Sequence, residues 1–508
     1  MTLLKFVSLL LLGLVLVAQC APQKKFRRNM VRGRPMSGFV PKPAKTGRFV
    51  GNEFVTAGKF QNLVDHFSTT NNTATYSQNY WYSDQWYKPG GPAFLMLGGE
   101  SAEDAGWVSD GDLAWTQMAA ENGAFVFLLE HRYYGTSRPT ADMSTQNLVY
   151  LSSAQALEDM AVFIRAMKKQ FTQLYAVPWV TFGGSYSGAL AAWARVKHPE
   201  LVAMAVGSSG PVQAEVDFVE YLEVVQNSIT RESKQCADSV TTAFNLVASM
   251  LQTASGRKSL QTTFNLCEAL DPTNAQQIET FWSTVYSPYM EVVQYSGDNA
   301  GLFNNLLTIK NAICRFHESS ATSLTKLKQV NNYFNTLSGY TGCEDIDYQS
   351  FIDFMKDTTY GDAQEIRAWV WQTCTEFGYY QSTDSNTAGP FFGGKPSLPV
   401  KYYIDECTNI YGADYNSASV ASAVANVNAY YGGRDNMNSS YILLPNGDID
   451  PWHALGKLLS NNKKIIPVVI NGTAHCADMY GPAANDLPTL TAARKTIFAQ
   501  LKQWLDSY

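Results

Sequence analysis

Two serines, Ser185 and Ser187, lie in a glycine-rich turn between an apolar run and a helix-like run, in the stretch VPWVTFGGSYSGALAAWARVKHPE. A serine hydroxyl becomes a nucleophile when a sharp strand-to-helix turn lifts it out of a sheet and a base removes its proton. The residues two positions before and after such a serine must be small, because neighbouring backbone approaches closely. Ser185 has Gly183 two residues before it, whereas Ser187 has no glycine at either position. We therefore predict Ser185 as the nucleophile and Ser187 as a tolerated small residue.

A nucleophilic serine needs an acid and a histidine, which in folds with this turn follow it along the chain in that order. Of the six histidines, only His317, His453 and His475 lie far downstream, and His317 falls in a region of helical spacing. His475 follows the apolar run KIIPVVI and Asp450 follows the run YILLP, so we expect both in loops at strand ends. We predict Asp450 as the acid and His475 as the base, with Asp448 and His453 as the second choices.

An acyl-transfer site also needs backbone N–H donors aimed at the oxyanion. We predict one donor from Tyr186, which follows the nucleophile, and one from Gly99, in the loop after the apolar run FLMLGG. Glu100 comes next and is either a structural loop acid or a ligand for a substrate amine; the sequence leaves both open. An ordinary tight turn is the competing interpretation of the serine stretch, because GGSYS departs from the G-x-S-x-G pattern.

Short apolar runs alternate with helix-like runs on both sides of these motifs, which indicates a mainly parallel sheet with helices on its two faces. Pro92–Gly99 and Val177–Gly184 read as buried strands, and Ala154–Gln170 reads as a helix from its apolar spacing. The same alternation returns near the C-terminus and ends in a helix-like run. We therefore predict an α/β core in two parts, residues 54–212 and 425–508.

The segment between the two parts, residues 213–424, reads as an inserted helical cap domain. It holds six of the seven cysteines that follow Cys20, and the seventh is Cys476. In an exported protein we expect these cysteines to form disulfides, with one thiol left over because seven is odd. None has the spacing of a zinc site, so we predict no metal and no cofactor.

The N-terminus indicates export, because a lysine, a short apolar run and small residues make residues 1–21 a predicted signal peptide. We expect residues 22–53 to be a poorly ordered basic leader or propeptide, since export argues against a nucleic-acid partner. No later apolar run is long enough for a membrane span. Three sequons, at Asn71, Asn438 and Asn471, are predicted glycosylation sites. The expected location is extracellular or lysosomal.

Six motifs occur along the chain in the order NLVDHF, FLMLGGE, EHRYYGTS, GGSYSGALAAWARVKHPELV, NGDIDPWHALG and AHCADM. Together they resemble the family of lysosomal Pro-Xaa carboxypeptidase, dipeptidyl peptidase II and thymus-specific serine protease, with the thymus-specific branch closest. The resemblance runs from about residue 58 to the C-terminus. Ser187 departs from it, because the family usually has glycine or alanine there.

This resemblance implies an α/β-hydrolase core with a large helical cap, and it places the nucleophile, acid and base at Ser185, Asp450 and His475. It also implies the disulfides Cys236–Cys314, Cys267–Cys343 and Cys374–Cys407.

The predicted function is a secreted or lysosomal serine peptidase, an exopeptidase that cleaves next to proline in peptide substrates through an acyl-enzyme. A homodimer is left open. Two alternatives remain, because a fold does not fix a function. One is an esterase or lipase on the same fold, and the other is a catalytically inactive luminal binding protein.

Overall fold

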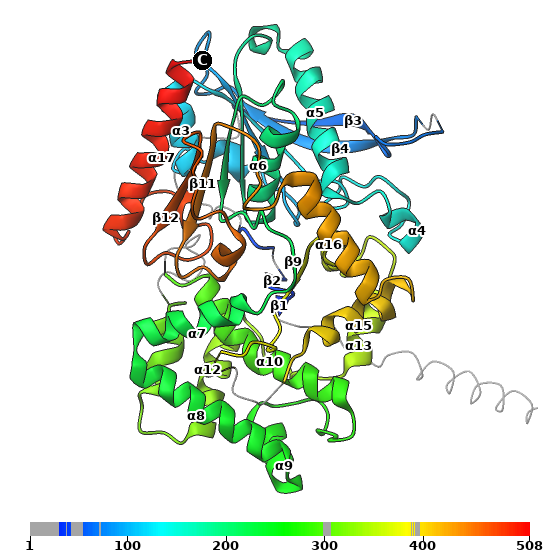
Figure 1. Cartoon of the computed structure of the whole chain (residues 1–508), viewed down its shortest axis with the longest axis vertical. Helices are drawn as coiled ribbons and strands as arrows, with labels where there is room; N and C mark the ends of the chain where they lie inside the picture. The colour runs from blue at the N-terminus through cyan, green and yellow to red at the C-terminus, as the bar shows by residue number, and fades with distance from the viewer. Residues whose placement is uncertain are drawn as a thin grey trace, which may run out of the picture.

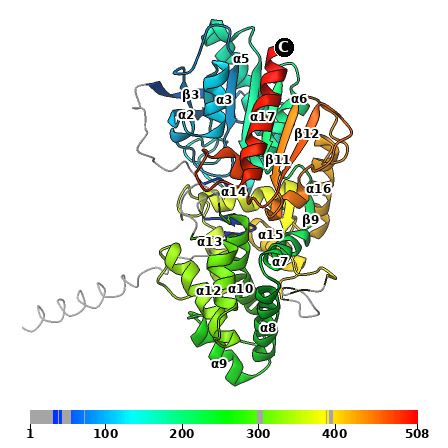
Figure 2. The same ribbon diagram turned by 90° about the vertical axis from the view of Figure 1, so that its left-hand side faces the viewer.

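The structure is a computed structural model, and the residues that it describes are 30–36, 38–41, 54–70, 73–297, 306–387, 389, 391 and 397–508. The predicted signal peptide and the Asn71 sequon lie outside these residues. The molecule has two halves, a sheet flanked by helices and a group of inserted helices below it (Figure 1). The view turned by 90° shows the same division (Figure 2).

One eight-stranded sheet forms the upper half, in the order β12-β11-β8-β7-β5-β6-β4-β3 (Figure 1). Strand β4 runs antiparallel to both of its neighbours, and every other pair in this sheet is parallel. This order confirms the predicted α/β-hydrolase fold. The strands are β3 (Val55–Leu63), β4 (Thr75–Ser83), β5 (Ala93–Leu97), β6 (Phe125–Leu129), β7 (Trp179–Gly184), β8 (Met204–Ser208), β11 (Ile442–Gly447) and β12 (Ile465–Ile470).

The central strands are apolar throughout because both faces of the sheet are buried. Along β5, Leu95 belongs to one hydrophobic core and the adjacent Phe94 to another, as the two-residue period of a strand requires. Helices α5 and α6 contribute to the first core, and helices α3 and α17 to the second. Their bounds are α3 (Ala114–Asn122), α5 (Ser153–Gln170), α6 (Tyr186–Lys197) and α17 (Pro488–Asp506).

The lower half is helical and carries the disulfides Cys236–Cys314, Cys267–Cys343 and Cys374–Cys407, the pairs that the resemblance implies. Cys476 is a buried free thiol. No helix in the described part of the chain is long and apolar enough to cross a membrane. The longer helices between β8 and β11 are α7 (Glu220–Glu232), α8 (Lys234–Leu251), α9 (Ala254–Thr263), α10 (Ala275–Gln294), α12 (Ser323–Leu337), α13 (Tyr348–Met355), α14 (Gln364–Gln372), α15 (Val400–Tyr411) and α16 (Ser417–Tyr431).

Short elements complete the structure. Strands β9 and β10 form a two-stranded parallel sheet that joins the residues just before α7 to those between α14 and α15. The bounds are α2 (Gly106–Ser109), α4 (Thr145–Leu148), α11 (Arg315–His317), β9 (Glu215–Asp217), β10 (Gly378–Tyr380), η2 (Thr172–Leu174), η3 (Ile309–Cys314), η4 (Thr373–Phe377), η5 (Pro451–Leu455) and η6 (Ala477–Met479).

The described part of the leader corrects our expectation of poor order, because residues 30–36 and 38–41 are almost wholly buried. Strands β1 (Met30–Val31) and β2 (Arg34–Pro35) form a small antiparallel hairpin between the two halves of the molecule (Figures 1 and 2). The physical reason is that the basic side chains of this hairpin meet acidic partners from distant elements, for example Glu406 on α15 for Arg32.

A buried ion pair fixes the loop that follows β6. The Arg132 guanidinium lies 2.6 Å from one oxygen of Asp159 on α5, and it also donates to the backbone of β3 and of the loop before α5. His66 and Tyr76 hydrogen-bond to the same carboxylate. Burial alone would raise the pKa of Asp159, but Arg132 and His66 outweigh it and lower the pKa.

We predict that Asp159→Asn lowers the free energy of unfolding by about 3–5 kcal/mol, because it leaves the Arg132 charge buried without its partner. Glu200→Gln, which disturbs a half-exposed pair with Arg165, is the control and costs less than about 1 kcal/mol. Urea unfolding measures both. Since the folded pKa of Asp159 is lowered, its stabilisation is present above about pH 4 and is lost as the pH falls. Equal costs for the two variants would contradict this account.

Candidate active site

Ser185 sits between the last residue of β7 and the first residue of α6. Its φ of 59° and ψ of −129° form a combination that residues other than glycine rarely adopt. The Ser185 N–H donates to the Ser208 carbonyl oxygen on β8, 2.9 Å away. A Cβ on Gly183 would lie 2.1 Å from the Ser187 carbonyl oxygen, so the close approach inferred from the sequence is real. The turn is the strained strand-to-helix turn that we predicted.

The Ser187 hydroxyl is engaged within the same turn. It donates to the Gly184 carbonyl oxygen at 2.9 Å and accepts the Gly184 N–H at 3.1 Å. The Ser187 Cβ also lies 3.5 Å from where a Cβ would stand on Gly99. Serine is therefore tolerated here because its hydroxyl stabilises the backbone that holds Ser185.

Asp450 and His475 meet at the same edge of the sheet as the serine turn. Strands β11 and β12 pair in parallel with Gly447 opposite Ile470, so the loops after them start side by side. One Asp450 oxygen accepts a hydrogen bond from His475 Nδ1 at 2.8 Å, and the other accepts the Trp452 N–H at 2.9 Å. Both side chains are fully buried. Burial alone would lower the pKa of His475, but the Asp450 carboxylate raises it well above 6.5.

The second-choice residues have other partners. Asp448 binds Arg231 on α7 at 2.9 Å and the Gly472 N–H at 2.6 Å, and it has no contact with His475 among its hydrogen bonds in the described chain. His453 Nδ1 is 2.6 Å from the backbone oxygen of Asp450, rather than from its carboxylate. His317 is buried in the helical half beside the Tyr289 hydroxyl, and burial lowers its pKa to about 4.

The serine and the histidine are not joined by a hydrogen bond. Within the part of the chain that the structure describes, the buried His475 Nε2 atom has no hydrogen-bond partner. Aromatic rings surround the imidazole instead, with centroids at 6.0 Å for Phe39, 6.0 Å for Tyr295 and 6.4 Å for Trp452. Catalytic hydrogen bonds often tighten only when substrate binds, so this geometry leaves Ser185 a candidate.

The two predicted oxyanion donors differ in their surroundings. Tyr186 is the first residue of α6, so its N–H has no acceptor within the helix. The Tyr186 hydroxyl lies 3.0 Å from His131 Nε2 and accepts from Gln372 Nε2 at 2.9 Å, which fixes the residue. The Gly99 N–H donates to a Glu103 oxygen at 3.3 Å, so this donor is occupied in the structure.

Two glutamines of the helical half support the site, and our sequence analysis did not identify either of them. Besides Gln372, the key residue is Gln294 at the end of α10, whose backbone oxygen accepts the His475 N–H at 2.9 Å. Its side-chain oxygen accepts from Trp452 Nε1 at 2.9 Å and from the Tyr221 hydroxyl at 2.6 Å. No local pattern marks such residues, because Trp452, the partner of Gln294, and Tyr186, the partner of Gln372, are each more than 150 positions away along the chain.

Glu100, left open by the sequence, is buried in the loop after β5. One carboxylate oxygen accepts the Phe39 N–H at 2.8 Å, and the other has no hydrogen-bond partner among the described residues. Burial raises the pKa of Glu100, and the positive charge of Arg34 offsets part of that shift. In the structure, therefore, the Glu100 carboxylate accepts a hydrogen bond from a backbone N–H of the leader.

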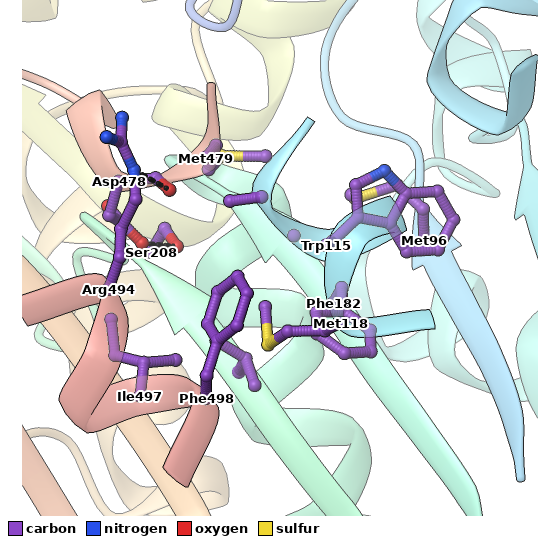
Figure 3. Close-up of a pocket in the computed structure, with 13 residues that line it drawn as sticks. Met96, Trp115, Met118, Phe182, Ser208, Asp478, Met479, Arg494, Ile497 and Phe498 are labelled. Atoms are coloured by element: carbon purple, nitrogen blue, oxygen red, sulfur yellow. Dashed lines mark hydrogen bonds between the residues drawn. The ribbon is translucent and has the colours of Figure 1, made fainter. Parts of the chain in front are cut away.

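A small cavity of about 20 Å³ lies behind the serine turn, on the face of the sheet that α3 and α17 cover (Figure 3). At its polar end the Ser208 hydroxyl donates to Asp478 at 2.6 Å, and the remaining wall is mainly apolar, with Trp115, Phe182 and Phe498 among its residues. This volume suits a water molecule rather than a peptide. The hydrogen bond between Ser208 and Asp478 in its wall joins the strand beside the serine turn to the loop that carries His475.

Two of the predicted glycosylation sites lie in the described chain. Asn438 and Asn471 are both exposed. The Asn471 amide also bonds to Arg231 at 2.8 Å and to Asp448 at 3.1 Å.

Serine hydrolases of the α/β-hydrolase fold carry their nucleophile on a turn of this kind, and the chain is a member of that class. The profile of a family described as Serine carboxypeptidase S28 matches residues 62–497. The chain belongs to this family and is a serine peptidase, which confirms the resemblance inferred from the six motifs.

Three relatives show how broad the similarity is. "Putative serine protease K12H4.7" of Caenorhabditis elegans is 62% identical over 486 residues, which cover 95% of each chain. "Thymus-specific serine protease" of Homo sapiens is 33% identical over 467 residues, covering 88% of this chain and 86% of that one. "Lysosomal Pro-X carboxypeptidase" of Mus musculus is 28% identical over 461 residues, covering 88% and 89%.

We predict that Asp450→Asn lowers the pKa of His475 below 6.5, because burial then acts without the opposing carboxylate. NMR titration of the imidazole C–H signals measures the shift. His131 and His317 are internal controls, since burial holds the pKa of each at about 4 in both proteins. An unchanged pKa for His475 would show that Asp450 is not its charge partner.

Proposed function

We propose that the chain is an exopeptidase that cleaves peptides next to proline through an acyl-enzyme on Ser185. The observation that carries the proposal is the fully buried Asp450–His475 pair, which lies in loops at the same sheet edge as the strained Ser185 turn. The name of the mouse relative, a Pro-X carboxypeptidase, supports the choice of proline. The rings of Tyr295 and Trp452 beside His475 offer an apolar surface on which a pyrrolidine ring can pack.

In the proposed reaction, His475 Nε2 takes the Ser185 proton as the serine oxygen attacks the peptide carbonyl carbon. The imidazolium gives this proton to the leaving nitrogen, the C–N bond breaks, and the acyl group stays on Ser185 as an ester. Water then attacks the ester with the same Nε2 as base, which releases the acid and restores the serine. Asp450 holds Nδ1–H and stabilises the imidazolium throughout.

The negative oxygen of the tetrahedral intermediate needs two N–H donors. The Tyr186 N–H at the start of α6 is the first, and the partial positive charge of a helix N-terminus adds to it. The Gly99 N–H is the second, provided that it leaves the Glu103 carboxylate, which it reaches only at 3.3 Å in this structure.

The proposed setting is the lumen of the secretory pathway, in a lysosome or outside the cell. Three disulfides suit an oxidising compartment, and the name of the mouse relative includes a lysosomal location. The proposed partners are peptides, and a homodimer stays a prediction.

We expect Ser185→Ala to lower kcat by at least about 10⁴-fold, as removal of a triad nucleophile does. Ser187→Ala is the matched control, because alanine fits the turn and only the bonds to Gly184 are lost. It should keep kcat within about tenfold. The assay measures kcat for hydrolysis of a proline-containing peptide and for hydrolysis of a short acyl ester. It uses a preparation in which the wild-type chain turns over substrate. Equal loss in both variants, or a preference for the ester, would contradict the proposal.

A further inference from the structure

Residues Met30–Met36 and Gly38–Pro41, which we call the cleft segment, lie between the sheet and the inserted helices (Figures 1 and 2). The segment is basic, yet Arg34 is fully buried and Phe39 is 1% exposed. Buried charge is costly unless it is paired, so a basic segment enters an interior only where a matching site exists. Its contacts show what that site is.

Two arginines of the cleft segment occupy prepared polar sites. Arg32 pairs with the buried Glu406 at 3.3 Å and donates to the Tyr403 carbonyl oxygen at 2.9 Å. Arg34 donates to the Glu100 carbonyl oxygen at 2.7 Å and pairs with Glu365 at 3.0 Å. One guanidinium therefore binds the helical half, and the other joins the sheet half to the helical half.

The residue between these arginines must be glycine. Gly33 has a φ of +72°, and a Cβ there would stand 2.6 Å from the Trp452 ring and 2.9 Å from the Gln381 amide. Its carbonyl oxygen accepts from Gln294 Nε2 at 3.2 Å. The site is thus specific for an Arg-Gly-Arg sequence.

Phe39 brings the cleft segment against the candidate catalytic residues. Its ring packs on Trp452 at 5.1 Å and on Trp369 at 5.2 Å, and its centroid is 6.0 Å from the His475 ring. The Phe39 N–H donates to Glu100, and its carbonyl oxygen accepts from the Tyr295 hydroxyl at 2.8 Å. Every hydrogen-bonding backbone atom of Phe39 is therefore engaged.

The next residues continue past the serine turn. The Val40 side chain lies 3.1 Å from where a Cβ would stand on Gly184, directly before Ser185. The Pro41 carbonyl oxygen accepts from the Tyr480 hydroxyl at 2.8 Å. With the segment in place, Ser185 is 1% exposed and His475 is fully buried. In this arrangement Ser185 has almost no surface that a peptide carbonyl could contact.

We propose that the cleft segment is an inhibitor built into the chain, bound where peptide substrates bind, and that the full chain is an inactive precursor until the segment leaves. This inference rests on the proposed function of Ser185 and His475. Because the segment is covalently attached, it binds at a high effective concentration, and as a free peptide it competes far less well. Its departure also frees Glu100 from Phe39 and opens the surface around Trp452.

The test compares variants of the full chain by the rate at which a fluorophosphonate labels Ser185, with the adduct located by peptide mass spectrometry. Phe39→Ala removes the ring that covers His475, and we expect labelling to accelerate by about 100-fold, in line with the loss of a buried phenylalanine. Arg32→Glu, which places a negative charge against Glu406, should also accelerate labelling. Phe67→Ala is the matched control, because Phe67 is 52% exposed and outside the segment.

A second readout uses the synthetic peptide of residues 30–41. It should bind the Arg32→Glu chain and slow its labelling, whereas the same peptide with Phe39→Ala should not. Wild-type chain that labels as fast as the Phe39→Ala variant would overturn the inference. So would a peptide that fails to slow labelling of the Arg32→Glu chain even at concentrations above the roughly millimolar effective concentration of an attached segment. If no variant labels at Ser185 although the peptide binds, the proposed catalytic function fails while the docking of the segment stands.

Discussion

The Asp450–His475 pair is the interaction on which the rest of the site depends. An imidazole without access to water holds a positive charge only if a carboxylate lies beside it. One Asp450 carboxylate oxygen lies 2.8 Å from His475 Nδ1. The sheet provides this distance, because β11 and β12 are parallel neighbours and end together. The serine turn at the end of β7 reaches the same edge. The α/β core therefore sets the geometry of all three candidate groups.

The helical half does more than cover this core. Gln294 on α10 holds the backbone of His475 and the ring of Trp452, and Gln372 on α14 holds the hydroxyl of Tyr186. Substrate access and the position of the base are thus linked to the same helices. A change that loosens these helices should disturb catalysis as well as specificity, although none of their residues takes part in the proposed proton transfers.

Much of the fold and of the candidate site could be predicted from the sequence. The features that could not be predicted depend on contacts between residues far apart along the chain. The sharp turn at Ser185 was predictable because a strand, small residues and a helix follow one another locally. The contact between Asp450 and His475 was predictable because strand ends gather at one sheet edge. The burial of Arg32 and Arg34 in the leader was not predictable, since they meet Glu406 and Glu365 from more than 300 positions away. A basic composition alone favours a solvated segment, and only the fold reveals the buried acids.

Direct observation of the acyl-enzyme would test the central claim most directly. A chain that turns over a proline-containing peptide or an activated ester is quenched with acid during the first turnover, and the modified residue is identified by mass spectrometry. Our account predicts the acyl group on Ser185 in the wild-type chain and little or none in a His475→Ala variant, because His475 is the base for acylation as well as for deacylation. An acyl group on Ser187, or turnover without any acylated serine, would contradict it.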